Sequence, residues 1–225
     1  MKNYKYIIYD LDGTLIDTRS GVKEAVRKTI DDLGLIPLAE KVLESFVGPP
    51  MQDSFQKYYS FDMESALSAA NLFRENYKKY SLFGGELYPG IIEMLRSQKK
   101  SMLKIAVATN KSHENAIAIL NHFGISDFCS CMKGSDMEGK LSKADIINLC
   151  IAEFGALKEE VLYIGDSYYD SKGAEEAGID FLGVTYGFGF RSRSDFMNIR
   201  YVSICENVEG INRFLELGVK NKAGI

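Results

Sequence analysis

The stretch YKYIIYDLDGT, residues 4–14, decides the fold of this chain. Its first six residues are apolar and β-branched enough to form a strand that is buried on both faces. Asp10, Leu11, Asp12, Gly13 and Thr14 follow at once, and two acids with a glycine end the strand. In open sheets of parallel strands, ligands bind where the strands end. We therefore expect a functional site directly after this strand.

Similar apolar runs recur along the chain, and they predict further strands over residues 104–109, 161–165, 181–184 and, more weakly, 201–204. Between them, apolar residues recur with helical spacing over residues 89–97, 112–123 and 142–154. Strands that alternate with helices of about 10–15 residues indicate right-handed βαβ units. The predicted fold class is α/β, with a doubly wound, mostly parallel, Rossmann-like sheet.

Residues 16–83 interrupt this alternation, because they contain no convincing strand. Helical spacing predicts four helical segments there, over residues 21–33, 38–45, 51–59 and 63–80. The whole chain has 225 residues, about one and a half typical domains. We therefore expect an α/β core domain of residues 1–15 and 84–225, and a helical cap domain of residues 16–83. A cap on two linkers can hinge and exclude water from a site.

Charge and composition limit the partners of the chain. The net charge is −4, which argues against a nucleic-acid polymer or an anionic membrane as the main partner. No apolar stretch is long enough to span a membrane, and the first ten residues lack the apolar region of a signal peptide, so we expect a cytoplasmic protein. Four cysteines and two histidines argue against a disulfide scaffold and a zinc site. A monomer and a homodimer are both compatible with the sequence.

Asp10 and Asp12 form the first polar cluster. On an extended chain, residues two apart point to the same side, and two carboxylates so close repel each other. A hard cation such as Mg²⁺ prefers oxygen ligands and relieves this repulsion. A carboxylate beside the cation can then act as a nucleophile, and the second as an acid or base. Gly13 permits a sharp turn whose amides can face an anion, although a plain turn explains the same residues.

Two further clusters follow predicted strands. Thr109 and Asn110 precede a predicted helix start, and a hydroxyl, an amide and a helix N-terminus together suit phosphate oxygens. A simple helix cap explains this cluster equally well. Asp166 ends the strand over 161–165 and Asp170 follows one helical turn later, so the pair can complete a cation site. The alternative is that Asp166 only caps the helix.

A lysine precedes the third cluster. Lys143 begins the predicted helix over 142–154, where a cation opposes the helix dipole. A bound anion that the lysine neutralises explains this placement better. Lys140 is the competing candidate for the same role, and we favour Lys143 because the helix fixes its position.

These clusters, in chain order, resemble the motifs of the haloacid-dehalogenase-like phosphatases. The matching residues are DLDGT at 10–14, TNK at 109–111, Lys143 and GDSYYD at 165–170. The segments GVTYGFG at 183–189 and FVGPP at 46–50 are similar to the phosphoglycolate-phosphatase-like branch. The resemblance covers nearly the full chain.

The resemblance implies a role for each acid. Asp10 would attack the substrate phosphorus and form an aspartyl-phosphate, and Asp12 would protonate the leaving oxygen and then activate water. Mg²⁺ would be held by Asp10, by the backbone carbonyl of Asp12 and by Asp166, with Asp170 in support. Asp12 also argues against dehalogenation, because the dehalogenases of this superfamily lack the second acid.

The resemblance also implies a phosphate-binding set and a reaction. Thr109 and Lys143 would hold the phosphate oxygens, with assistance from Asn110 and the Gly13 turn. The expected function is Mg²⁺-dependent hydrolysis of a small phosphorylated metabolite, such as a phosphoglycolate-like phosphomonoester. A 5'-nucleotidase or a pyrophosphatase of the same fold is the alternative. A non-catalytic, phosphate-responsive signalling module is a distant one, since such modules lack a large helical insertion.

Overall fold

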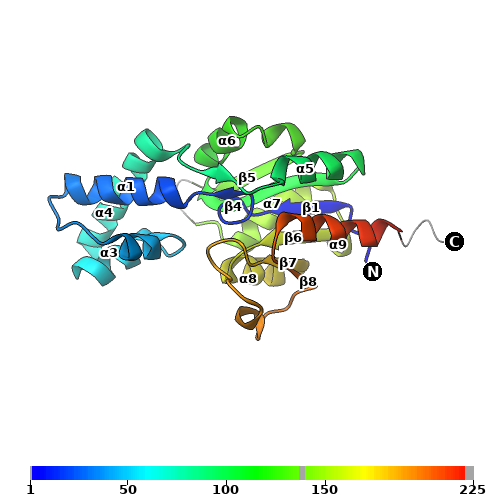
Figure 1. Ribbon diagram of the computed structural model, residues 1–225. Helices are drawn as coiled ribbons and strands as arrows, with labels where there is room; N and C mark the ends of the chain where they lie inside the picture. Colours follow the sequence, from blue (N-terminus) through cyan, green and yellow to red (C-terminus); the bar gives the residue numbers. More distant parts are fainter. Residues whose placement is uncertain (1, 137–139, 221–225) are drawn as a thin grey trace. The chain divides into compact units, whose positions relative to one another are not determined.

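The computed structural model describes residues 2–136 and 140–220 (Figure 1). The chain divides into two compact units. The core unit comprises Met1–Ile16 and Leu87–Ile225, and the helical unit comprises Asp17–Glu86. No helix within the described ranges is long and apolar enough to cross a membrane.

The core unit is built on a parallel sheet, which has six strands in the described part of the chain, in the order β5-β4-β1-β6-β7-β8. The strands are β1 (Tyr6–Tyr9), β4 (Lys104–Ser112), β5 (Cys131–Ser135), β6 (Val161–Gly165), β7 (Asp180–Val184) and β8 (Ser203–Cys205). The chain starts in the middle of the sheet, extends it to β5 on one side, and returns to extend it on the other. This confirms the predicted doubly wound α/β fold.

Helices cover both faces of this sheet. They are α5 (Ile91–Lys100), α6 (His113–His122), α7 (Lys143–Phe154), α8 (Tyr168–Ala177) and α9 (Val208–Lys220). Ile8 and Tyr163 pack with residues of α7 and α8 in one buried cluster. On the other face, the Tyr9 hydroxyl donates to Gln98 of α5 over 2.9 Å. Since side chains alternate along a strand, β1 is buried on both faces, as its sequence predicts.

One strand of the sheet is absent from the sequence prediction. β5 has the sequence CMKGS, which is only partly apolar, and it pairs with β4 alone at the edge of the sheet. An edge strand needs fewer buried side chains, so it leaves a weaker hydrophobic pattern than a central strand.

The helical unit has its own core of apolar side chains. Its helices are α1 (Arg19–Asp32), α2 (Glu40–Leu43), α3 (Met51–Tyr59) and α4 (Met63–Asn76), with a 3₁₀ turn at Glu44–Phe46 and a π-helical turn at Tyr77–Ser81. Phe46 and Phe55 are fully buried there, with ring centroids 5.4 Å apart. Two short strands, β2 (Ile16–Asp17) and β3 (Glu86–Leu87), pair where the chain passes between units. The expectation of no strand over 16–83 is wrong for β2, because two residues are too few to show a period.

Candidate active site

Three adjacent strands bring three site residues together at the carboxyl ends of the strands. Asp10 follows the last residue of β1, Asp166 follows the last residue of β6, and Thr109 lies near the end of β4. The Asp10 N–H donates to the Ile164 carbonyl over 2.9 Å, which continues the pairing between β1 and β6. All three side chains are buried. The parallel sheet therefore collects these polar groups at its carboxyl edge, as its topology requires.

Lys143 joins this group from the start of α7. A reciprocal capping box between Ser142 and Asp145 fixes the helix start. The Lys143 ammonium donates to Asp10 Oδ1 over 2.8 Å and lies 2.9 Å from Asp170 Oδ1. Burial alone would lower the pKa of Lys143, but the charges of Asp10 and Asp170 raise it above its usual range. The lysine is therefore held as a cation within the cluster.

The backbone N–H of Lys140, the competing lysine, donates to Asp136 Oδ1 over 2.8 Å. Residues 137–139, which include Gly139 before it, lie outside the described residues.

Asp10, Asp166 and Asp170 form a compact group of buried carboxylates. Each offers one oxygen that lies within 4.8 Å of the oxygens of the other two. Burial raises the pKa of Asp10 to about 8, against the opposing charge of Lys143. Burial and the charge of Asp170 raise the pKa of Asp166 to about 7. When the three acids are ionised, their charge exceeds that of Lys143, and a divalent cation stabilises such a group of carboxylates.

Backbone and hydroxyl donors fix two of these carboxylates. Asp166 Oδ2 accepts from the N–H groups of Phe188, at 2.7 Å, and Gly189, at 3.0 Å. Asp170 Oδ2 accepts from the N–H and hydroxyl of Ser167, at 3.0 and 2.6 Å. Ser167 is the N-cap of α8, so the alternative interpretation of Asp166 as a helix cap is wrong. Oδ1 of Asp170 stays turned toward Lys143.

Asp12 has a different partner from Asp10. Its carboxylate is 26% exposed and lies 3.2 Å from the ammonium of Lys111, whose side chain is 13% exposed. Among the described residues, the carboxylate of Asp12 is not part of the three-acid group. Sequence reasoning missed the pairing of Lys111 with Asp12, although Lys111 stands in the TNK motif. The pair places a carboxylate and an ammonium group together beside the turn that follows β1.

Both the backbone conformation and the close packing at position 13 require a glycine. Its φ is +82°, a region that favours glycine, and a Cβ at this position would overlap the carboxylate of Asp166. Its N–H donates to the Ile16 carbonyl over 2.9 Å. This hydrogen bond closes the turn.

The other two predicted phosphate ligands differ in burial. Thr109 is buried, and its Oγ1 accepts from the N–H of Lys111 over 3.2 Å. Asn110 is exposed. Because Tyr9 is in register with Val107 on the neighbouring strand, Thr109 lies at the same edge of the sheet as Asp10.

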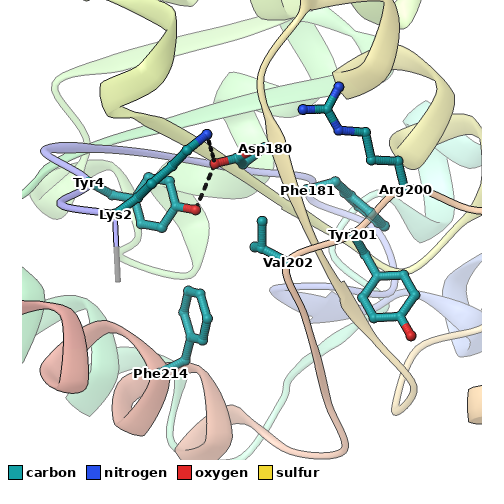
Figure 2. A pocket seen from close by; sticks show the side chains of 8 residues that line it. All are labelled: Lys2, Tyr4, Asp180, Phe181, Arg200, Tyr201, Val202 and Phe214. Atoms are coloured by element: carbon teal, nitrogen blue, oxygen red, sulfur yellow. Dashed lines mark hydrogen bonds and ion pairs between the residues drawn. The ribbon is translucent and has the colours of Figure 1, made fainter.

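A cavity of about 320 Å³ lies at the opposite end of the strands, where they begin (Figure 2). Tyr4 precedes β1, and Asp180 is the first residue of β7. The Lys2 ammonium and the Tyr4 hydroxyl both donate to Asp180 Oδ2 over 2.8 Å (Figure 2). This cavity is separate from the carboxylate cluster, because Asp10 follows the other end of β1 and Asp166 follows the carboxyl end of the neighbouring strand β6.

Comparison with known proteins identifies the family of this chain. Residues 7–184 match the family model described as haloacid dehalogenase-like hydrolase, and the chain belongs to this family. It is 31% identical over 214 residues to a 5'-nucleotidase of Pseudomonas aeruginosa, covering 95% of this chain and 96% of the relative. It is 29% identical over 188 residues to a phosphoglycolate phosphatase of Rhodobacter capsulatus, covering 81% and 84%.

A solved structure described as a putative phosphatase from Clostridium difficile matches the fold with a TM-score of 0.87. The two chains are 31% identical, and the match covers 96% of this chain and all of the other. The chain is therefore a phosphatase of the haloacid dehalogenase-like family, a phosphoric monoester hydrolase.

Proposed function

We propose that this phosphatase requires Mg²⁺ and hydrolyses a small phosphomonoester through a phosphorylated Asp10. One observation carries the proposal: the buried carboxylate of Asp10 lies against Lys143 and within one group with Asp166 and Asp170. A carboxylate that is fixed, buried and flanked by a cation can act as a nucleophile.

The donor set fits Mg²⁺. The buried cluster combines three carboxylates with one ammonium, so two negative charges stay uncompensated when all three acids are ionised. Asp10, Asp166 and Asp170 would hold the ion, together with the backbone carbonyl of Asp12. When bound, Mg²⁺ neutralises charge on the transferred phosphoryl group.

Each of the chain's own site residues then has a separate role in the two steps of the reaction. A carboxylate oxygen of Asp10 bonds to phosphorus as the bond from phosphorus to the leaving oxygen breaks, and Asp12 donates a proton to that oxygen. Asp12 next takes a proton from water as the water oxygen attacks phosphorus. The bond from phosphorus to Asp10 breaks, which frees phosphate and restores the carboxylate. Lys143 and the Thr109 hydroxyl hold phosphate oxygens through both steps.

Two substrate classes are candidates. A phosphoglycolate-like carboxylic phosphomonoester agrees with the relative from Rhodobacter capsulatus. A nucleoside 5'-monophosphate agrees with the relative from Pseudomonas aeruginosa, which matches nearly the whole length of both chains. Phosphate release from phosphoglycolate, nucleoside monophosphates and pyrophosphate, measured with Mg²⁺ and with EDTA, distinguishes them. Equal rates with Mg²⁺ and EDTA would contradict the proposed metal dependence.

The helical unit, Asp17–Glu86, is proposed to act as a lid that sets substrate choice. Its own apolar core supports this role, since a lid must move as a body. Hydrogen exchange at the connecting residues 16–17 and 86–87 should slow when Mg²⁺ and vanadate are added. Unchanged exchange there would argue against a lid.

A further inference from the structure

The segment after β7, residues 185–190, contacts two parts of the active site, and we name it the clamp loop. Its first contact is with Asp166. Besides the two N–H groups of Phe188 and Gly189 on the carboxylate, the Phe190 N–H donates to the Asp166 carbonyl over 2.6 Å. Three consecutive amides therefore hold one residue. With Oδ2 held in this way, Oδ1 is the oxygen that Asp166 can offer to a cation.

The second contact is with the turn that carries Asp10. The Tyr186 hydroxyl donates to the Thr14 carbonyl over 2.9 Å. The ring of Tyr186 packs edge-on against Tyr88, with centroids 4.7 Å apart. The hydroxyl is thus directed by packing, and it fixes the last residue of the DLDGT turn.

Between these two contacts, the loop backbone at Gly187 lies close to both the Asp166 carboxylate and the turn at Gly13. A Cβ at Gly187 would overlap Asp166 Oδ2 and the carbonyl of Gly13. Any side chain at this position would force the carboxylate and the turn apart. Glycine here is explained by close approach, because the structure gives it no left-handed φ.

We propose that the clamp loop fixes the Asp10–Thr14 turn and the Asp166 carboxylate relative to each other, and that Tyr186 is a positioning residue of this phosphatase. The inference rests on the proposed Mg²⁺-dependent function. Asp10 and Asp166 come from different strands, and the loop is bonded to both of their segments. Its effect is to keep two ligands of one cation at a constant separation.

The test replaces Tyr186 by phenylalanine, which keeps the ring and removes the hydroxyl. Two quantities are measured: the Mg²⁺ concentration at half-maximal thermal stabilisation, and kcat and KM for p-nitrophenyl phosphate. One buried hydrogen bond is worth about a fivefold change in an equilibrium constant. We expect the Mg²⁺ midpoint to rise about fivefold and kcat to fall about fivefold, while KM changes less than about twofold.

Tyr4→Phe is the matched control. It also removes a tyrosine hydroxyl that donates to a largely buried partner, but at the opposite edge of the sheet (Figure 2). It should lower Tm without moving the Mg²⁺ midpoint or kcat by more than about twofold. If Tyr186→Phe behaves like Tyr4→Phe, the positioning role is wrong and the proposed function stands. If the wild type itself shows no response to Mg²⁺, the proposed function and this role both fail.

Gly187→Ala gives a second, independent variant. Its Cβ displaces Asp166 Oδ2 directly, so the Mg²⁺ midpoint should rise further than in Tyr186→Phe. A folded Gly187→Ala protein with the wild-type midpoint would overturn the proposal.

Discussion

The ammonium of Lys143 lies 2.8 Å from Oδ1 of Asp10, and both side chains are less than one-tenth exposed. The cation that is proposed to hold the substrate phosphate thus contacts the proposed nucleophile directly. It also bonds Asp170. The pair links α7 to the central strand, and each charge opposes the pKa shift that burial alone would cause in its partner.

Lys143→Met should impair both stability and catalysis. Removing the ammonium leaves the buried carboxylates without their partner, which costs about 3–5 kcal/mol at a pH where they are ionised. We expect kcat to fall by about a hundredfold or more, because phosphate oxygens lose their buried cation. Urea unfolding and steady-state kinetics measure the two effects.

Lys140→Met is the control, since Lys140 is itself exposed and lies before the start of α7. It should change both quantities little. Wild-type kcat in Lys143→Met, or the larger loss in Lys140→Met, would reverse our assignment of the phosphate lysine.

Stability of the metal-free protein should fall as the pH rises. In the unfolded chain, carboxyls ionise near pH 4, whereas burial raises the pKa of Asp10 to about 8 and of Asp166 to about 7. The folded state therefore binds more protons between these limits. The stability that this provides is complete below about pH 4 and is lost as the pH rises through 7 and 8.

Mg²⁺ should oppose this loss, because it stabilises the ionised acids. The increase in Tm on adding Mg²⁺ should be larger at pH 8.5 than at pH 6, as differential scanning fluorimetry would measure. An equal increase at both pH values would show that Mg²⁺ does not compete with protons at these carboxylates.

Gly13→Ala should destabilise the protein through contact as well as backbone strain. Gly34→Ala is the matched control, because Gly34 also has a positive φ, +62°, but no atom of the described residues, other than those of its chain neighbours, lies within 4 Å of its Cβ position. The control should cost about 1–2 kcal/mol, the strain of a left-handed alanine. Gly13→Ala should cost more and weaken Mg²⁺ binding, since its Cβ overlaps Asp166. Equal losses in chemical denaturation would mean that the turn accommodates the methyl group.

Lys111→Met should lower kcat by about tenfold, because Asp12 loses the cation that lies beside it. Lys133→Met is the control, since Lys133 forms a more exposed ion pair with Glu153 that contributes little. Steady-state kinetics of both variants with p-nitrophenyl phosphate provide the comparison. A wild-type kcat in Lys111→Met would show that the ion pair of Lys111 with Asp12 does not contribute to catalysis.

Local patterns predicted most of the fold and the clustering of the acids. The helix over Met51–Tyr59 and the strand over Val161–Gly165 have the bounds expected from apolar spacing. The sequence predicts that Asp10, Asp166 and Asp170 lie close together, because the carboxyl ends of parallel strands lie on the same side of the sheet. The roles of these residues in binding and catalysis stay predictions.

Contacts between segments that are distant in the chain could not be predicted from the sequence. Lys111 pairs with Asp12, which is 99 positions earlier in the chain, and no periodicity relates the two. The segment GVTYGFG was noticed for its resemblance to a branch of the family, but not for its contacts. The structure explains Gly187 through its close approach to Asp166, which the sequence does not reveal.

The central claim is that Asp10 is the nucleophile of a Mg²⁺-dependent phosphatase. The most direct measurement is phosphate release from p-nitrophenyl phosphate by the wild type and by Asp10→Asn, each with Mg²⁺ and with EDTA. Asp180→Asn is the control, because it changes a buried carboxylate at the other edge of the sheet. We expect turnover by the wild type and Asp180→Asn with Mg²⁺ only, and a loss on the order of a thousandfold in Asp10→Asn. Turnover by Asp10→Asn at a rate near that of the wild type would contradict the account.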